Sequence, residues 1–369
     1  MSQNTVRSSS YAVKYVIIMC MHRKFATAEI IIILLFTTFT GCVFKPDGTN
    51  ITLPSSNLSE NRGNLTSSRI IYTMKGVGID LPPDDFADMK KAGIEILGTE
   101  WGMEESIVRV RAFLDQAEKA GLKVVMDGGF SYTAWGFTDD DWDNLPPGKH
   151  PVWQKERVQK WVDALKDHPA IYAWDICNEF GENLPSGAGI RGSDWPRGRI
   201  TLEQIKQAKA DIQAIDPTRL FHLRMYGWNT EKMEPHINAL LSSGIIDIIS
   251  LNLYSNYLEK GRLEWPGVIQ DAGQYYVDKI KELSPKTKVW LSIAAFEYPG
   301  IFQRPTNFSL IRDLKSATRI KNLDGISFFC WGPVSQWDDK CNWYLPQTGT
   351  DIWDIIKRYL KDPQKFVAN

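Results

Sequence analysis

The sequence predicts an α/β fold, a single (β/α)8 TIM barrel. Short apolar runs alternate with amphipathic stretches of helical spacing along most of the 369-residue chain. Strands that alternate with helices indicate a parallel sheet, and eight such units have the proportions of a closed barrel. An open doubly wound sheet is the alternative. That sheet needs a phosphate-binding glycine-rich turn after its first strand, and residues 76–80 do not continue into one.

Eight apolar runs have the length of strands, and we expect each to form one strand of the barrel. The runs are residues 74–79, 94–97, 122–126, 171–176, 220–225, 245–253, 289–295 and 325–330.

Amphipathic helices are expected between the strands. In residues 107–120 and 158–165, apolar side chains recur every three or four positions. Gly93, Gly121 and Gly244 are expected to end helices, because glycine adopts the left-handed conformation of a helix C-terminus at little cost. Further helices are expected at residues 202–215, 231–241, 268–283, 310–320 and 352–360.

The first 69 residues are expected to lie outside the barrel. Residues 30–39 form an apolar run after Arg23 and Lys24 that is too short to span a membrane and is typical of a secretory signal. The following Thr-Gly-Cys resembles a prokaryotic lipobox, which implies a lipid on Cys42; an uncleaved anchor is the alternative. We therefore expect a leader over residues 1–42, a flexible Ser/Asn/Thr-rich linker over 43–69 and the barrel over 70–369, anchored to the membrane at the cell surface or in the periplasm.

Composition excludes several classes of function. A net charge of −1 provides no basic surface for nucleic acid, so we expect no such partner. The sequence has no histidine pair or cysteine cluster at metal-ligand spacing, no phosphate loop and no serine elbow. We therefore expect no metal and no cofactor. His222 in the fifth strand is expected to be a hydrogen-bonded core residue. We also expect the protein to be a monomer. A disulfide between Cys330 and Cys341 is left open.

The C-terminal ends of the strands are where a (β/α)8 barrel builds its active site. In this chain they carry carboxylates, amides and aromatic side chains, and the missing motifs leave carboxylates as the catalytic groups. Aromatic loops follow three of these strands, and the chain has fourteen Trp, whose flat rings stack on sugars. Packing of those loops is the alternative use. The aromatic loops favour a cleft that binds sugars, and its candidate residues at the strand ends and in the loops are Asn178, Tyr254, Trp331, Glu100, Trp101, Asp127, Trp135, Trp228 and Asn252.

Residues 172–180, Tyr-Ala-Trp-Asp-Ile-Cys-Asn-Glu-Phe, resemble the strand-four signature of the clan A glycoside hydrolases. These are retaining barrel glycosidases and include cellulases, mannanases and β-galactosidases. The resemblance implies that Glu179 is the acid/base and that Asn178 holds the sugar 2-hydroxyl. It also implies a nucleophile at the end of strand seven, where Glu297 is the only carboxylate. Tyr254 then corresponds to the tyrosine beside the nucleophile and Trp331 to the platform under the sugar, with core packing as the alternative for both.

A retaining glycosidase needs a protonated acid and an ionised nucleophile about 5 Å apart. Glu179 and Glu297 each lie eight residues after the first residue of their apolar run, so both are expected at the same rim. In many relatives, however, the strand-seven Glu directly follows the apolar run, which would place it near Ile293. Either strand seven is longer or bulged, or the nucleophile has been lost. Glu100 is the reserve candidate.

Two functions therefore remain. The first is a glycoside hydrolase that cleaves a β-linked oligo- or polysaccharide with retention. The second is a non-catalytic barrel that binds carbohydrate at the cell surface. A barrel lyase or isomerase is disfavoured because the sequence shows no metal or phosphate site.

Overall fold

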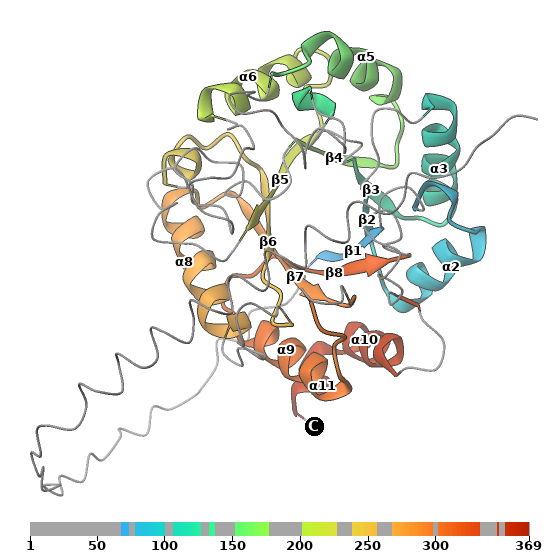
Figure 1. Cartoon of the computed structure of the whole chain (residues 1–369), viewed down its shortest axis with the longest axis vertical. Coiled ribbons are helices and arrows are strands. Elements are labelled where there is room, and N and C mark those ends of the chain that lie inside the picture. Colours follow the sequence, from blue (N-terminus) through green and yellow to red (C-terminus); the bar gives the residue numbers. More distant parts are fainter. Residues whose placement is uncertain are drawn as a thin grey trace, which may run out of the picture. The chain divides into compact units, whose positions relative to one another are not determined.

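The computed structural model describes residues 68–73, 78–99, 106–126, 133–136, 152–176, 201–226, 238–256, 268–297, 302–332, 345–346 and 351–368. All of them belong to one compact unit, Arg62–Asn369, and none to the other unit, Met1–Asn61. The predicted fold is confirmed: eight parallel strands close into one barrel in chain order, because β1 pairs with β8. Helices surround this barrel (Figure 1).

Strands β1 to β8 are Ser68–Thr73, Ile96–Gly98, Lys123–Met126, Ile171–Asp175, Leu220–Tyr226, Ile248–Asn252, Lys288–Ala294 and Gly325–Trp331. Among the described residues, the α-helices include α2 Pro83–Ala92, α3 Ile107–Lys119, α5 Lys155–Leu165, α6 Leu202–Gln213, α8 Gly273–Leu283, α9 Asn307–Arg319, α10 Ile352–Lys361 and α11 Pro363–Ala368. Short helical turns are η1 Gly78–Asp80, η2 Thr133–Trp135 and η4 Val268–Ala272.

The first strand is not where the sequence predicted it. We expected residues 74–79, whereas β1 is Ser68–Thr73 and residues 78–80 form the 3-10 turn η1. Two short apolar runs lie next to each other here, and the upstream one pairs with both neighbouring strands. Ile70 and Tyr72 then face the barrel interior while Ile71 faces the helices. β1 therefore includes the last two residues of the predicted linker, which was expected to end at residue 69.

The other seven strands lie where the sequence predicted them, with ends shifted by a few residues. The predicted glycine stops are also confirmed, since Gly93, Gly121 and Gly244 all have positive φ angles. Helix α9 begins three residues earlier than predicted, because Thr306 and Ser309 form a capping box at its start. Of the expected helix at 231–241, residues 238–241 are described and helical. Within the described ranges, no helix is both long and apolar enough to cross a membrane.

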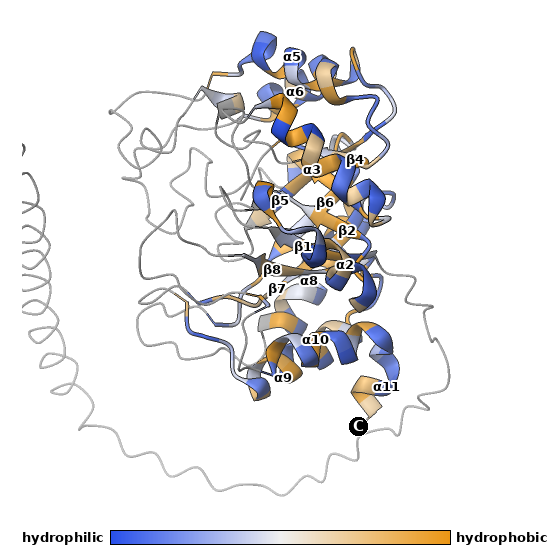
Figure 2. Cartoon of the chain, turned by 90° about the vertical axis from the view of Figure 1, so that its right-hand side faces the viewer, coloured by the Kyte–Doolittle hydropathy of each residue, from blue (hydrophilic) through white to orange (hydrophobic). Residues whose placement is uncertain are grey.

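Two apolar layers hold the barrel together. One lies between the strands and the helices and includes Leu97, Val124 and Leu291; the other fills the barrel interior and includes Val125, Trp290 and Phe329. Figure 2 shows mostly hydrophobic strands inside and hydrophilic stretches on the surrounding helices. Along most of the strands, the alternation of side chains assigns neighbouring residues to different layers; at the end of β8, Phe329 and Cys330 both belong to the interior layer.

Two glycines make room for large rings in the barrel interior. A Cβ on Gly98 would lie 2.0 Å from the Tyr72 ring, and one on Gly325 would lie 2.4 Å from the Trp290 ring. Both rings are fully buried. The interior is therefore packed with side chains, and the site must lie at its C-terminal mouth.

Candidate functional site

The described residues include part of the predicted site. They contain Trp135, Asn252, Tyr254, Glu297 and Trp331. The remaining predicted site residues, Asn178, Glu179, Glu100, Trp101, Asp127, Trp228 and Cys42, lie outside them.

The end of β4, directly before the predicted Asn178–Glu179 pair, is anchored on several sides. The Trp174 indole N–H donates to Asp216 at 2.9 Å, on the helix side of the strand. The Ile176 N–H donates to the His222 carbonyl at 3.3 Å, and the Ile176 carbonyl accepts the Trp135 indole N–H at 2.9 Å. Glu179 follows Ile176 by three residues in the sequence, so the last described residue before it is held by β5 and the loop after β3.

Four hydroxyl, imidazole and carboxylate groups form a chain across the barrel interior. Tyr72 Oη lies 2.9 Å from Ser250 Oγ, and Ser250 Oγ lies 2.8 Å from His222 Nε2. His222 Nδ1 lies 2.9 Å from Asp175 Oδ2. The Tyr72–Ser250 and Ser250–His222 contacts are hydrogen bonds, whereas the His222–Asp175 contact is a close approach without hydrogen-bond geometry. The predicted core role of His222 is thus confirmed, and the chain ties together β1, β6, β5 and β4.

Asp175, His222 and Ser250 have the connectivity of an Asp–His–Ser catalytic triad. All three residues are completely buried. Asp175 Oδ2 also accepts the Nε–H of Arg224 at 3.1 Å, in an ion pair whose side chains are 0% and 3% exposed. A serine nucleophile must reach its substrate, so this group supports the barrel and is not a hydrolytic triad. Sequence reasoning missed Arg224, although a charged residue two positions after His222 in an apolar strand predicts the same inward direction.

Glu297 lies three residues beyond the end of β7. The strand pairing extends one residue further than Ala294, because the Ala295 N–H donates to the Phe329 carbonyl. The Glu297 side chain is 23% exposed, and its Oε2 accepts a hydrogen bond from Nε of Arg304 at 2.9 Å and lies 2.9 Å from Nη2 in an ion pair. A charge-assisted hydrogen bond of this kind holds the side chain and balances its charge.

An aromatic cluster made of Tyr254, Phe296, Phe302 and Phe329 includes the residue before Glu297 in the chain and joins the ends of β6, β7 and β8. The Tyr254 ring centroid lies 5.4 Å from Phe296, 5.7 Å from Phe302 and 6.0 Å from Phe329. Tyr254 is 5% exposed, so most of its ring packs within this cluster. Asn252, two residues earlier at the end of β6, is also buried. Sequence reasoning missed Phe296 and Phe329, which are the inward-facing aromatics at the ends of β7 and β8.

Trp331 packs on the helix side of β8, away from the barrel interior. It is 1% exposed, its indole N–H donates to Asp85 of α2 at 2.9 Å, and its ring meets Trp353 of α10 edge to face. This is the core packing that the sequence left as the alternative to a sugar platform. Next to it, the buried Cys330 thiol donates to the Gly332 carbonyl at 3.8 Å, and Cys341 lies outside the described residues.

Trp135 is likewise a core residue in the structure. It is completely buried in η2, and its ring lies 4.9 Å from that of Trp153. With its N–H on the Ile176 carbonyl, the indole packs the loop after β3 against the end of β4. It therefore has the loop-packing role that the sequence analysis gave as the alternative to sugar stacking.

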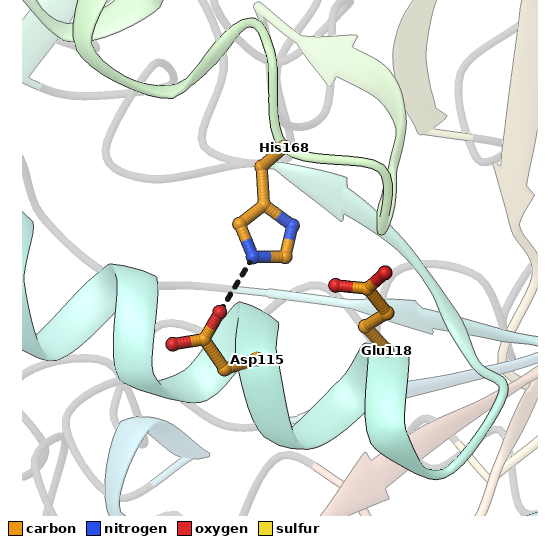
Figure 3. A group of neighbouring side chains, drawn as sticks. All are labelled: Asp115, Glu118 and His168. Atoms are coloured by element: carbon orange, nitrogen blue, oxygen red, sulfur yellow. Dashed lines mark hydrogen bonds and ion pairs between the residues drawn. The ribbon is translucent and has the colours of Figure 1, made fainter.

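One group of potential metal ligands lies at the opposite end of β4 (Figure 3). The ligand atoms of Asp115, Glu118 and His168 lie within 4.8 Å of one another. His168 Nδ1 accepts the Ala170 N–H, which places the imidazole proton on Nε2, and Nε2 faces Asp115 at 3.1 Å. A metal on Nε2 would need the electron pair that this proton occupies. The group therefore fits a hydrogen-bonded support of the loop before β4 better than a metal centre.

Comparisons with known proteins give structural matches alone. No family model matches the chain, and no curated protein matches its sequence. The fold is similar to a β-galactosidase from the Antarctic haloarchaeon Halorubrum lacusprofundi, with a TM-score of 0.57 and 12% identity over 79% of this chain and 58% of that one. It is also similar to a GH10 endoxylanase from a sugarcane soil metagenome, with a TM-score of 0.53 and 11% identity over 80% and 97%.

A third similar structure is an exo-β-1,4-mannosidase from Opitutaceae bacterium strain TAV5. The TM-score is 0.51 and the identity 12%, over 82% of this chain and 60% of that one. The chain thus spans about three fifths of the galactosidase and the mannosidase and nearly all of the xylanase. At identities this low, the likeness shows that this chain has the barrel fold of these enzymes.

Proposed function

We propose that the protein is a glycoside hydrolase that cleaves β-linked oligo- or polysaccharides with retention of configuration. One observation carries the proposal: the barrel closes so that the Asn178–Glu179 pair follows β4 and Glu297 follows β7. Barrel enzymes place catalytic groups at these strand ends. The structural neighbours named as xylanase, β-galactosidase and mannosidase support the same class of chemistry.

In this mechanism Glu179 donates a proton to the glycosidic oxygen while the Glu297 carboxylate attacks the anomeric carbon. The bond between that carbon and the leaving oxygen breaks, and a glycosyl ester forms on Glu297. Glu179 then takes a proton from water, which displaces Glu297 and releases the sugar. Arg304 would hold Glu297 in place during both steps. Asn178 is proposed to hold the 2-hydroxyl, with further sugar contacts from Glu100, Trp101, Asp127, Trp228 and Asn252.

The test is hydrolysis of a panel of aryl β-glycosides and β-linked polysaccharides by the full chain. We expect Glu179→Gln and Glu297→Gln each to lower kcat by at least about 1,000-fold, since each removes a group required in the transition state. Glu203→Gln, which changes an exposed carboxylate on α6, is the matched control and should keep full activity. Hydrolysis that persists in both site variants would contradict the proposal.

The alternative is a non-catalytic barrel that binds carbohydrate. Its support is that Ala294 and Phe296 at the end of β7 pack in the interior layer, while the Glu297 carboxylate is paired with Arg304. Calorimetric binding of oligosaccharides without hydrolysis would favour this alternative. So would a Glu179–Glu297 carboxyl separation well beyond about 9 Å in a sugar complex, because neither glycosidase geometry then exists.

We also propose export and anchoring to the membrane through a lipid on Cys42, with an uncleaved anchor as the competing form. The support is the charged, apolar and small-residue order of residues 23–42. Mass spectrometry of the mature N-terminus distinguishes the two forms. A diacylglyceryl cysteine at position 42, lost in Cys42→Ser, is the expected result, and an intact leader would contradict it.

A further inference from the structure

Asn256, four residues after the end of β6, binds both segments that carry the Glu297–Arg304 pair. Its Nδ2 donates to the Phe296 carbonyl at 3.2 Å and to the Gln303 carbonyl at 2.7 Å. The backbone carbonyl of Asn256 accepts the Gln303 N–H at 2.8 Å. Asn256 is 5% exposed, and its bond to Phe296 is buried while its bond to Gln303 is partly buried.

The orientation of the Asn256 amide follows from its partners. Both nearby acceptors are backbone carbonyls, and only the NH2 group can donate to them. Among the described residues, Oδ1 is buried and has no hydrogen-bond donor. A flipped amide would instead face two carbonyl oxygens with its own oxygen and leave NH2 unpaired. The contacts therefore assign one orientation.

The two carbonyls occupy corresponding places in the chain. Phe296 directly precedes Glu297, and Gln303 directly precedes Arg304. Glu297 and Arg304 form the ion pair described above, at 2.9 Å. One buried amide thus sets the spacing between the backbone of the carboxylate and the backbone of its guanidinium partner.

We propose that Asn256 is a positioning residue for Glu297. It joins the strand β7 extension to the segment before α9 and so fixes the Glu297 carboxylate against Arg304 at the barrel mouth. The proposal rests on the proposed glycosidase function for its effect on rate, but the contacts themselves are independent of that function.

The test compares two substitutions of Asn256 with one of its neighbour. Asn256→Asp keeps the shape but places an oxygen against the two carbonyls, and Asn256→Leu keeps a similar volume without added charge. Ser255→Ala is the matched control: Ser255 is 4% exposed and also ties the end of β6 to α9, through Asp313, but it does not contact either carbonyl. For each full-length variant we would measure kcat and KM, thermal unfolding, and hydrogen exchange of residues 295–304.

We expect both Asn256 variants to lower kcat by about 100-fold with KM changed less than about threefold, since displacement of a catalytic group by about 1 Å has this effect. Exchange in residues 295–304 should accelerate in both variants and stay unchanged in Ser255→Ala. Loss of activity in Asn256→Asp alone would point to added charge and overturn the proposal. Equal loss in Ser255→Ala would also overturn it.

If the wild-type protein hydrolyses no substrate in the panel, the glycosidase proposal fails while the exchange measurement still decides the role of Asn256. Faster exchange confined to residues 295–304 would support the positioning role. Unchanged exchange would contradict it.

Discussion

Arg224 and Asp175 form a buried ion pair inside the barrel, and their charges cancel there. Each lies on an inward-facing position of a mainly apolar strand. His222 Nδ1 also lies 2.9 Å from Asp175 Oδ2, and the neutral Ser250 and Tyr72 hydroxyls continue from the other side of the imidazole without adding charge. Removing one partner of a buried pair leaves the other charge without compensation.

Arg224→Met should therefore lower the free energy of unfolding by about 3–5 kcal/mol. Urea unfolding followed by tryptophan fluorescence measures this change. The double variant Arg224→Met/Asp175→Leu should lose less than Arg224→Met alone, because it removes the isolated charge as well. A double variant that is less stable than the single one would contradict this explanation.

A substitution of Trp331 distinguishes a core-packing role from a sugar-platform role. Trp331→Phe removes the N–H that binds Asp85 and part of a buried ring, which should cost about 1–3 kcal/mol of stability. If Trp331 is a core residue, KM for the hydrolysed sugar stays unchanged. A raised KM with an unchanged unfolding free energy would restore the sugar-platform role.

The side-chain directions at the mouth explain why these residues were hard to assign from sequence. The sequence places Phe329 and Trp331 at the end of β8, and both are aromatic. Phe329 packs with the interior layer and Trp331 with the helix layer. Along β8 the register with β1 skips a residue, from Phe329 to Trp331, so a simple alternation does not predict the direction of Trp331. Backbone irregularity of this kind leaves no signal in composition.

Helices α5 and α6 are joined through Asp211, which is buried between them. The carboxylate pairs with Lys155 at 2.8 Å and accepts hydrogen bonds from Trp153 and Gln207, each at 3.0 Å. Burial alone would raise the pKa of Asp211, but these three donors outweigh it and hold the pKa below its ordinary value. Asp211 therefore stabilises the fold above its unfolded pKa of about 3.9, and this contribution is lost as pH falls through the folded pKa.

Asp211→Asn should accordingly be less stable than the wild type at pH 7, and the difference should shrink as the pH is lowered below about 4. Urea unfolding at several pH values measures it. Asp163→Asn, which removes an exposed ion pair with Lys166, is the control and should change little at any pH. A stability difference between the wild type and Asp211→Asn that grows towards acid pH would contradict this prediction.

Among the strands, β1 shows where periodicity fails. Residues 70–72 and 74–79 both offer short apolar runs, and a strand of this length needs few residues. Which run pairs with β2 and β8 depends on barrel closure, a contact between the two ends of the domain. For the other strands, helices on both sides limit the choice to one run, and the prediction is correct.

The barrel as a whole was predictable because its signal repeats eight times. Each strand and helix pair adds the same pattern, and a misplaced strand leaves the count unchanged. The candidate site has no such redundancy. The sequence indicates which strand ends carry carboxylates. It does not indicate that Arg304 pairs with Glu297 or that Asn256 binds the Gln303 carbonyl, because these contacts are made by loops, whose hydrogen bonds have no periodic pattern in the sequence.

Covalent labelling of the nucleophile tests the glycosidase mechanism most directly. The full-length protein would be incubated with a 2-deoxy-2-fluoro glycoside of the sugar it hydrolyses, which slows release of the glycosyl ester, and the labelled peptide would be identified by mass spectrometry. We predict one adduct, on Glu297, and none in Glu297→Gln. An adduct on another carboxylate, such as Glu100, or no adduct at all, would contradict the assignment of Glu297 as the nucleophile of a retaining enzyme.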